Sequence, residues 1–224
     1  MVGEGNRLIP IVPAIGNHEV QDGGFNQTAN HAPFFYSLFA FPGEPGYGAL
    51  DFGQYLSVLC LDTQHTNPVA GEQSDWITAA LEARKQIPHV LAVYHVPAWP
   101  SARNPRNLQS RRVREAWVPI FEAHGLDFAF EHHDHAYKRT HPIRNNRIDA
   151  TGPVYFGDGG FAQGETRVPK SPGHWLTGGR WYLSASGSAN HFHLVTIDGR
   201  TRKFEAIDAA GHAFDSYAMT AGIP

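Results

Sequence analysis

Short apolar runs alternate with helix-like stretches along the middle of this 224-residue chain. Residues 49–63 read as two strands with a turn near Gly53, and the runs at 89–95 (HVLAVYH) and 126–135 (LDFAFEHHDH) are each typical of a buried strand. Helical patterns at 72–87 and 108–124 separate them. Parallel neighbours need such a crossover, so this order predicts an α/β core with partly parallel strands.

The two ends of the chain add further strands to this core. The run LIPIVPAIGNHE (8–19) predicts a buried strand that delivers Asn17 and His18 to a loop at its C-terminal end. From residue 154 onward the pattern is strand and turn, with hairpin signals at 198–199 and 210–211. We therefore expect a second sheet, built from antiparallel strands and packed on the first, within one domain spanning 1–224.

Composition excludes several broad classes of protein. A net charge of −3 gives no basic footprint for nucleic acid, and 42% hydrophobic with 17% charged residues is typical of a folded globular chain. No run approaches the roughly 18 apolar residues that span a bilayer. The lone Cys60 excludes an internal disulfide framework, and residues 1–10 lack the pattern of a signal peptide.

Metal-ligand side chains gather where the expected strands end. The stretch EHHDHAYKRTHP at 131–142 holds four of the 14 histidines, among them His133 and His135. His95 ends another expected strand, and Asn17 with its neighbour His18 ends a third. A single histidine at a strand end is more often a satisfied polar residue than a ligand. Because ligands bind beyond the carboxyl ends of strands and metal sites draw ligands from several elements, the set predicts a metal site.

Five segments now resemble a known family. GNHE (16–19), VYHVPAWPS (93–101) and HHDHAYKR (132–139) are similar to three of the five signature blocks of calcineurin-like metallophosphoesterases. The form HxHAYxR, with GPVYFGDGG (152–160) and HFHLVTIDG (191–199), most resembles the purple acid phosphatase branch. The resemblance implies an α/β/β/α sandwich, in which two packed mixed β-sheets are flanked by helices.

The resemblance also implies a role for each site residue. Asn17, His95 and His133 would bind one metal ion and His135 the other, while His18 would hydrogen-bond the phosphate and protonate the leaving alkoxide. The complete enzyme would hold two ions, with Fe, Zn or Mn expected, and would hydrolyse phosphate monoesters.

Two departures from the family pattern change this expectation. The blocks that supply the first metal's carboxylate and the bridging Asp have no counterpart before Gly16, so the chain resembles an N-terminally truncated part of a longer enzyme without its first strand–helix–strand units. We expect it to bind one ion weakly, to turn over little substrate, and to expose a sheet edge prone to self-association. His132 also replaces the usual Gly, where a side chain would crowd the turn or add a donor. The full-length parent would be secreted or periplasmic.

Other functions stay open at this point. The chain could be a non-catalytic metal- or phosphate-binding remnant, a subunit completed by another chain, or a phosphodiesterase. A metallo-β-lactamase pattern fails at Tyr137 and Lys138, and GDGG at 157–160 predicts a turn rather than a phosphate loop. His191 and His193 are expected at the rim of the site rather than as ligands.

Overall fold

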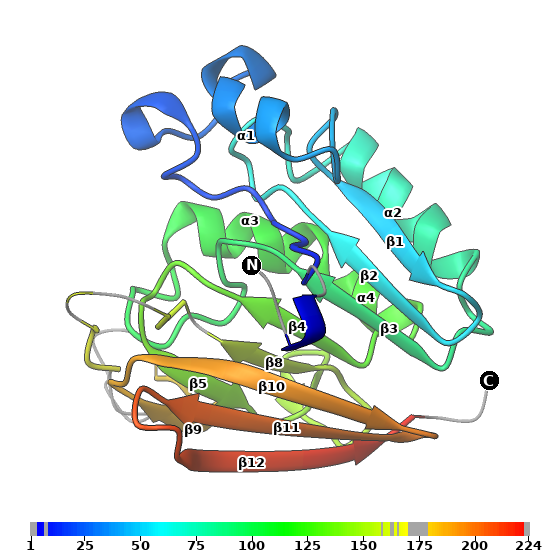
Figure 1. Cartoon of the computed structure of the whole chain (residues 1–224), viewed down its shortest axis with the longest axis vertical. Coiled ribbons are helices and arrows are strands. Elements are labelled where there is room, and N and C mark those ends of the chain that lie inside the picture. Colours follow the sequence, from blue (N-terminus) through cyan, green and yellow to red (C-terminus); the bar gives the residue numbers. More distant parts are fainter. Residues whose placement is uncertain are drawn as a thin grey trace.

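A seven-stranded mixed sheet forms the centre of the protein (Figure 1). The computed structural model describes residues 4–6, 9–157, 159–161, 164, 166–169 and 179–221. The strands of the sheet are β1 (Gly48–Phe52), β2 (Leu56–Cys60), β3 (His89–Val93), β4 (Phe128–Glu131), β5 (Tyr137–Thr140), β8 (Val154–Gly157) and β9 (Leu183–Gly187). They lie in the order β1-β2-β3-β4-β8-β5-β9, and β2, β3, β4 and β8 run parallel. The expected α/β core with partly parallel strands is confirmed.

Helices fill the crossovers between the parallel strands. Helix α2 (Glu72–Glu82) connects β2 to β3, and α3 (Leu108–Ala116) with α4 (Val118–Ala123) connects β3 to β4. The single helix predicted at 108–124 is therefore two helices that meet at Trp117. Pro119 explains the break, because it has no N–H to continue the helical hydrogen-bond ladder.

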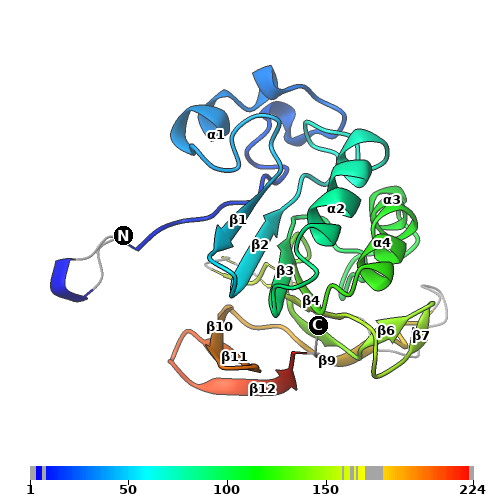
Figure 2. The same cartoon turned by 90° about the vertical axis from the view of Figure 1, so that its right-hand side faces the viewer.

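One face of the large sheet packs against these helices (Figure 2). Ile77 of α2 and Phe121 of α4 are fully buried there, in one apolar cluster with Ala92 and Ala129 of the sheet. Each fully buried Ile or Phe side chain stabilises the fold by about 1.5–3 kcal/mol. Because β3 and β4 contribute residues to this cluster, packing in the core fixes the positions at which the segments after these strands begin.

The other face of the large sheet packs against a three-stranded antiparallel sheet. Its strands are β10 (His191–Asp198), β11 (Thr201–Asp208) and β12 (Ala213–Thr220), joined by hairpins at both predicted turns. Phe204 of β11 stacks on Phe156 of β8, with ring centroids 4.3 Å apart, and meets Phe128 edge-on at 4.9 Å. The expected second sheet is confirmed, and a two-stranded hairpin of β6 (Ile143–Arg144) and β7 (Arg147–Ile148) lies outside both sheets.

Ion pairs connect the two sheets at opposite ends. Arg202 of β11 is fully buried; it donates to His89 Nδ1 at 2.8 Å and pairs with Asp127 at 2.5 Å. Arg139 of β5 pairs with Asp215 of β12 at 2.8 Å, and Tyr137 donates to the same carboxylate. Tyr137 and Arg139, which flank the histidine motif, therefore connect β5 to the smaller sheet.

The strand predicted at 8–19 is wrong. Residues 9–16 form no strand and appear in Figure 2 as a blue coil that approaches the sheet from the side. Pro10 and Pro13 have no N–H to donate to a ladder, and Ile9 and Ile11 are exposed, so only the end of the run, at Ile15, is fully buried. The segment still carries Asn17 and His18 to the carboxyl ends of β3 and β4.

The stretch from 21 to 48 is largely irregular. It contains the 3-10 turns Gln21–Gly23 and Ala29–His31 and the short helix α1 (Pro33–Leu38), and a further 3-10 turn spans Glu4–Asn6. In the parts of the chain described, no helix is long and apolar enough to cross a membrane.

Strand β10 leaves one edge of the smaller sheet open. Within the described residues its only hydrogen-bonded neighbour is β11, and Phe192 and Leu194 are each 46% exposed. An exposed edge was expected, whereas self-association through it stays a prediction.

The inward face of β10 generates a prediction about pH. Burial, and next the nearby His191 and His132, lower the pKa of His193 to about 3. The unfolded chain, with a pKa near 6.5, then binds this proton more readily than the folded chain. Stability from the neutral imidazole is complete above about pH 6.5 and is lost as pH falls from there toward 3.

Replacing His193 with Leu should flatten the fall of the unfolding free energy between pH 6.5 and 4, by at most about 1.4 kcal/mol per pH unit. Urea melts at several pH values measure this, and equal slopes in both proteins would contradict it.

Candidate metal centre

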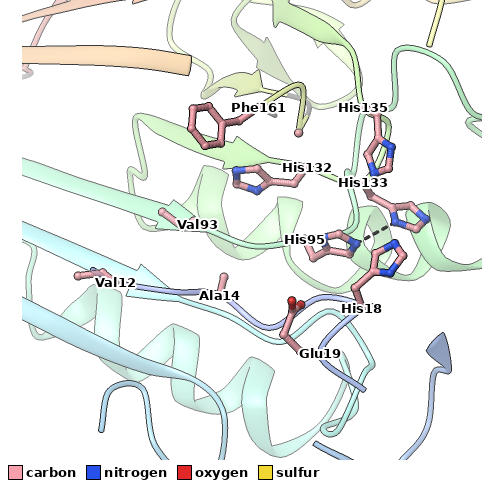
Figure 3. Close-up of a pocket in the computed structure, with 11 residues that line it drawn as sticks. Val12, Ala14, His18, Glu19, Val93, His95, His132, His133, His135 and Phe161 are labelled. Carbon is pink, nitrogen blue, oxygen red and sulfur yellow. Dashed lines mark hydrogen bonds between the residues drawn. The ribbon is translucent and has the colours of Figure 1, made fainter. Parts of the chain in front are cut away.

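The site lies where the parallel strands β3 and β4 end. His95 lies two residues beyond the last residue of β3, and His133 lies two residues beyond the last residue of β4. The backbone ladder continues past both strands, with Tyr94 N donating to Phe130 O at 3.1 Å and His132 N to His95 O at 2.9 Å. This pairing brings the two histidines together, and Figure 3 shows their rings adjacent, with that of His18 beside them.

Three donor atoms form a small triangle at this edge of the sheet. His95 Nε2 lies 2.7 Å from Asn17 Oδ1 and 2.8 Å from His133 Nδ1, which is itself 3.1 Å from Asn17 Oδ1. A metal ion about 2.1 Å from three mutually perpendicular ligands holds them about 3.0 Å apart. The triangle therefore has the size of one face of an octahedral coordination shell, and the three residues fit one cation.

The remaining site residues line the same cavity without joining the triangle. The cavity has a volume of about 360 Å³, and His18, Glu19 and His135 are among its lining residues. Among the described residues, no group of three or more His, Cys, Asp or Glu side chains is placed to hold a metal. A cation bound at the triangle would therefore depend on the amide of Asn17, and His135 is not part of the triangle.

Burial keeps the imidazoles of the site neutral. It lowers the pKa of His95 well below its usual range, with the neighbouring His133 as the second cause. Burial, and next the charge of Arg103, lower the pKa of His133 to about 3. The pKa of His135 is also lowered, by burial first and then by Arg167 and Arg103. Since metals bind the neutral imidazole, these rings are in the ligand form near neutral pH.

The loop that carries the histidines has an unusual backbone. His133 has φ of 73° and His135 of 54°, the left-handed region that non-glycine residues seldom adopt. Such residues cost about 1–3 kcal/mol each and persist only where their surroundings fix them. Two left-handed histidines in three residues therefore indicate a loop shaped for the placement of its side chains.

His132 and the glycines of GDGG shape the back of this loop. The His132 ring points away from the triangle (Figure 3), and its Nδ1 hydrogen-bonds the Tyr94 carbonyl at 2.8 Å. Gly157 and Gly159 have φ of 128° and 78°, and a Cβ at Gly157 would overlap the Glu131 carbonyl. These conformations let the end of β8 lie against the histidine loop, and the turn predicted for GDGG stays a prediction. Its Asp158 lies outside the described residues.

The structure also clarifies three other histidines. His191 and His193 line an adjoining cavity of about 300 Å³ and do not join the triangle. His65, which belongs to none of the motifs above, is fully buried with its ring centroid 5.3 Å from that of His95. It also stacks on Phe25 at 4.9 Å. No motif surrounds His65, so the sequence held no signal of this contact.

Several of the curated proteins that are similar to this chain are purple acid phosphatases. No protein-family model matches the sequence. Purple acid phosphatase 18 of Arabidopsis thaliana is 30% identical over 131 residues, which are 57% of this chain and 29% of that protein. Purple acid phosphatase 22 of the same plant is 27% identical over 206 residues, 89% of this chain and 44% of its own. The chain thus spans less than half the length of either relative.

Solved structures show the same fold. The purple acid phosphatase PPD1 from yellow lupin seeds superposes with a TM-score of 0.74 and 18% identity, over 92% of this chain and 39% of that one. The structure of PhoD gives a TM-score of 0.60 with 11% identity, over 86% of this chain and 45% of that one. The metallophosphoesterase-like sandwich expected from the sequence is confirmed.

Gly16 generates a prediction about the geometry of the site. A Cβ at Gly16 would lie 2.8 Å from His95 Nδ1 and 3.0 Å from Glu19 Oε2. Gly16→Ala should therefore displace the His95 ring from Asn17 and change the imidazole nitrogen shifts of His95 in NMR spectra of the metal-free protein. Gly164→Ala is the matched control, because a Cβ there would meet nothing within 4 Å. Unchanged His95 signals in Gly16→Ala would show that the contact does not fix the ring.

Proposed function

We propose that this chain carries part of the dinuclear metal site of a phosphate monoester hydrolase. By sequence and fold it is a relative of the purple acid phosphatases, a branch of the calcineurin-like metallophosphoesterases. The observation that supports this most directly is the triangle of Asn17 Oδ1, His95 Nε2 and His133 Nδ1. These residues would hold one divalent cation, with Zn, Mn or Fe as candidates.

A bound metal ion supplies Lewis-acid chemistry: it polarises a phosphoryl oxygen and lowers the pKa of a bound water. The protein's own residues hold and orient the substrate. His18 lines the cavity beside the triangle, where it would donate a hydrogen bond to the phosphate and give a proton to the leaving alkoxide. Arg103 and Arg167, whose charges act on His135, make the neighbourhood electropositive and so attract an anionic ester.

The described residues complete only one of the two cation sites. His135 is the one further residue that the family pattern assigns to the other ion, and Glu19 already accepts a hydrogen bond from Gly16 N at 2.8 Å. We infer that a carboxylate from outside these 224 residues bridges the two ions in the active enzyme. The open edge of β10 and the cavities beside it are where such a segment would pack. By itself the chain should bind one ion weakly, because three neutral ligands leave the positive charge uncompensated.

Metal titration tests the proposal. In isothermal titration with Zn²⁺ or Mn²⁺, the wild-type chain should bind one ion, and His133→Ala or Asn17→Ala should weaken that binding at least roughly tenfold. His212→Ala is the matched control, since its side chain is 80% exposed and lies in the β11–β12 turn. Equal binding by all four proteins, or no binding by the wild type, would rule out the triangle as a cation site.

Turnover assays with chromogenic mono- and diesters, with and without chelator, then separate the candidate functions. The proposal expects little turnover by this chain, and activity on the monoester once the family's two missing blocks are fused before it. Preference for the diester would favour a phosphodiesterase. Metal binding without turnover in the fused protein would favour a non-catalytic remnant, and strong turnover by the 224-residue chain would contradict the partial site.

A further inference from the structure

We propose that three buried charged side chains, Glu131, Asp134 and Lys138, are positioning residues that hold His95 and His133 at ligand spacing. The proposal rests on the function proposed above, in which these two histidines share a cation. All three charges lie in or beside the histidine loop, and each is fully buried. Glu131 and Lys138 pair with each other, and all three side chains also contact residues 94–103, the segment that carries His95.

Glu131 fixes the start of the histidine loop to the segment that follows β3. One carboxylate oxygen accepts hydrogen bonds from Tyr94 Oη and Ala98 N, both at 2.7 Å. The other accepts from Trp99 N at 3.4 Å and pairs with Lys138. A single carboxylate therefore holds two successive backbone amides that lie three and four residues after His95.

Asp134 lies between the two left-handed histidines and fixes the tip of the loop. Its Oδ2 accepts hydrogen bonds from the backbone N–H groups of Ala102, at 2.6 Å, and Arg103, at 2.9 Å. The Arg103 guanidinium approaches its Oδ1, with Nε at 3.4 Å. This second carboxylate again holds two successive amides of the segment that carries His95, farther along the chain.

Lys138 fixes the end of the loop. Its ammonium donates to the Trp99 carbonyl at 2.6 Å and pairs with Glu131. The loop is thus fastened at its start, tip and end to one neighbouring segment, and the left-handed conformations of His133 and His135 lie between these anchors.

This arrangement explains why charges are buried here at all. Burying paired charges adds little to stability compared with apolar residues of similar volume, so stability alone does not account for three of them. Apolar side chains cannot accept backbone N–H groups, whereas the two carboxylates select one register of segment 94–103 against the loop. That register sets the 4.7 Å separation of the His95 and His133 ring centroids.

The test separates positioning from stability. We would compare Asp134→Ala, the conservative Asp134→Asn and the double variant E131Q/K138M with Arg202→Met. The last is a matched control, because Arg202 is also fully buried and ion-paired but contacts His89 and Asp127 on the far side of the sheet. Thermal melts record the stability of each protein. Nuclear Overhauser effects between the two imidazoles record ring spacing in the metal-free protein, and optical titration with Co²⁺ alone records affinity.

Asp134→Ala and the double variant should weaken Co²⁺ binding roughly 10–100-fold and lose the His95–His133 Overhauser effect. Asp134→Asn should recover part of both, and Arg202→Met should lower the melting temperature while leaving both unchanged. Wild-type spacing and affinity in Asp134→Ala and the double variant, or an equal loss in Arg202→Met, would overturn the proposal. If the wild type binds no Co²⁺, the proposed cation site fails, and the metal-free Overhauser effects still decide the positioning role.

Discussion

The parallel pairing of β3 with β4 is the constraint on which the rest of the site depends. Leu91, Ala92 and Val93 pair with Phe128, Ala129 and Phe130, and the ladder runs on until His132 N bonds the His95 carbonyl. Because both strands point the same way, their carboxyl ends carry His95 and His133 to one edge of the sheet. Apolar packing on both faces of the sheet holds this pairing in place, so the core fixes the two strand ends from which the imidazoles project.

The same edge explains why the site is both prepared and incomplete. Burial keeps His95 and His133 neutral and the donor triangle matches one face of a coordination shell. A divalent ion held there by an amide and two imidazoles keeps its full charge, which a carboxylate would normally offset. The open edge of β10, with Phe192 and Leu194 exposed, lies on the side where a further segment would supply one. The further carboxylate that the proposed function requires and the open edge of β10 therefore point to the same part of the structure.

Much of this arrangement was predictable from local sequence pattern. The run at 89–95 lies between two helical patterns and the run at 126–135 follows the second, and each is mostly apolar before its polar end, so their strands and the polar groups at their ends were found. The run at 8–19 looked similar, but Pro10 and Pro13 remove the donors that a strand needs. Long-range contacts left no local signal: the approach of His65 to His95 and the pairing of Glu131 with Lys138 depend on tertiary packing. The roles of Asn17 and His18 came from the family motif and stay predictions.

The most direct test of the account is to locate a bound cation. Crystals of the chain soaked in Zn²⁺ and measured at the zinc absorption edge would show its position by anomalous scattering. The account predicts a single zinc bound by Asn17 Oδ1, His95 Nε2 and His133 Nδ1, each about 2.0–2.2 Å away. Zinc bound elsewhere, for example at His191 and His193, or no zinc within reach of the triangle at saturating concentration, would contradict it.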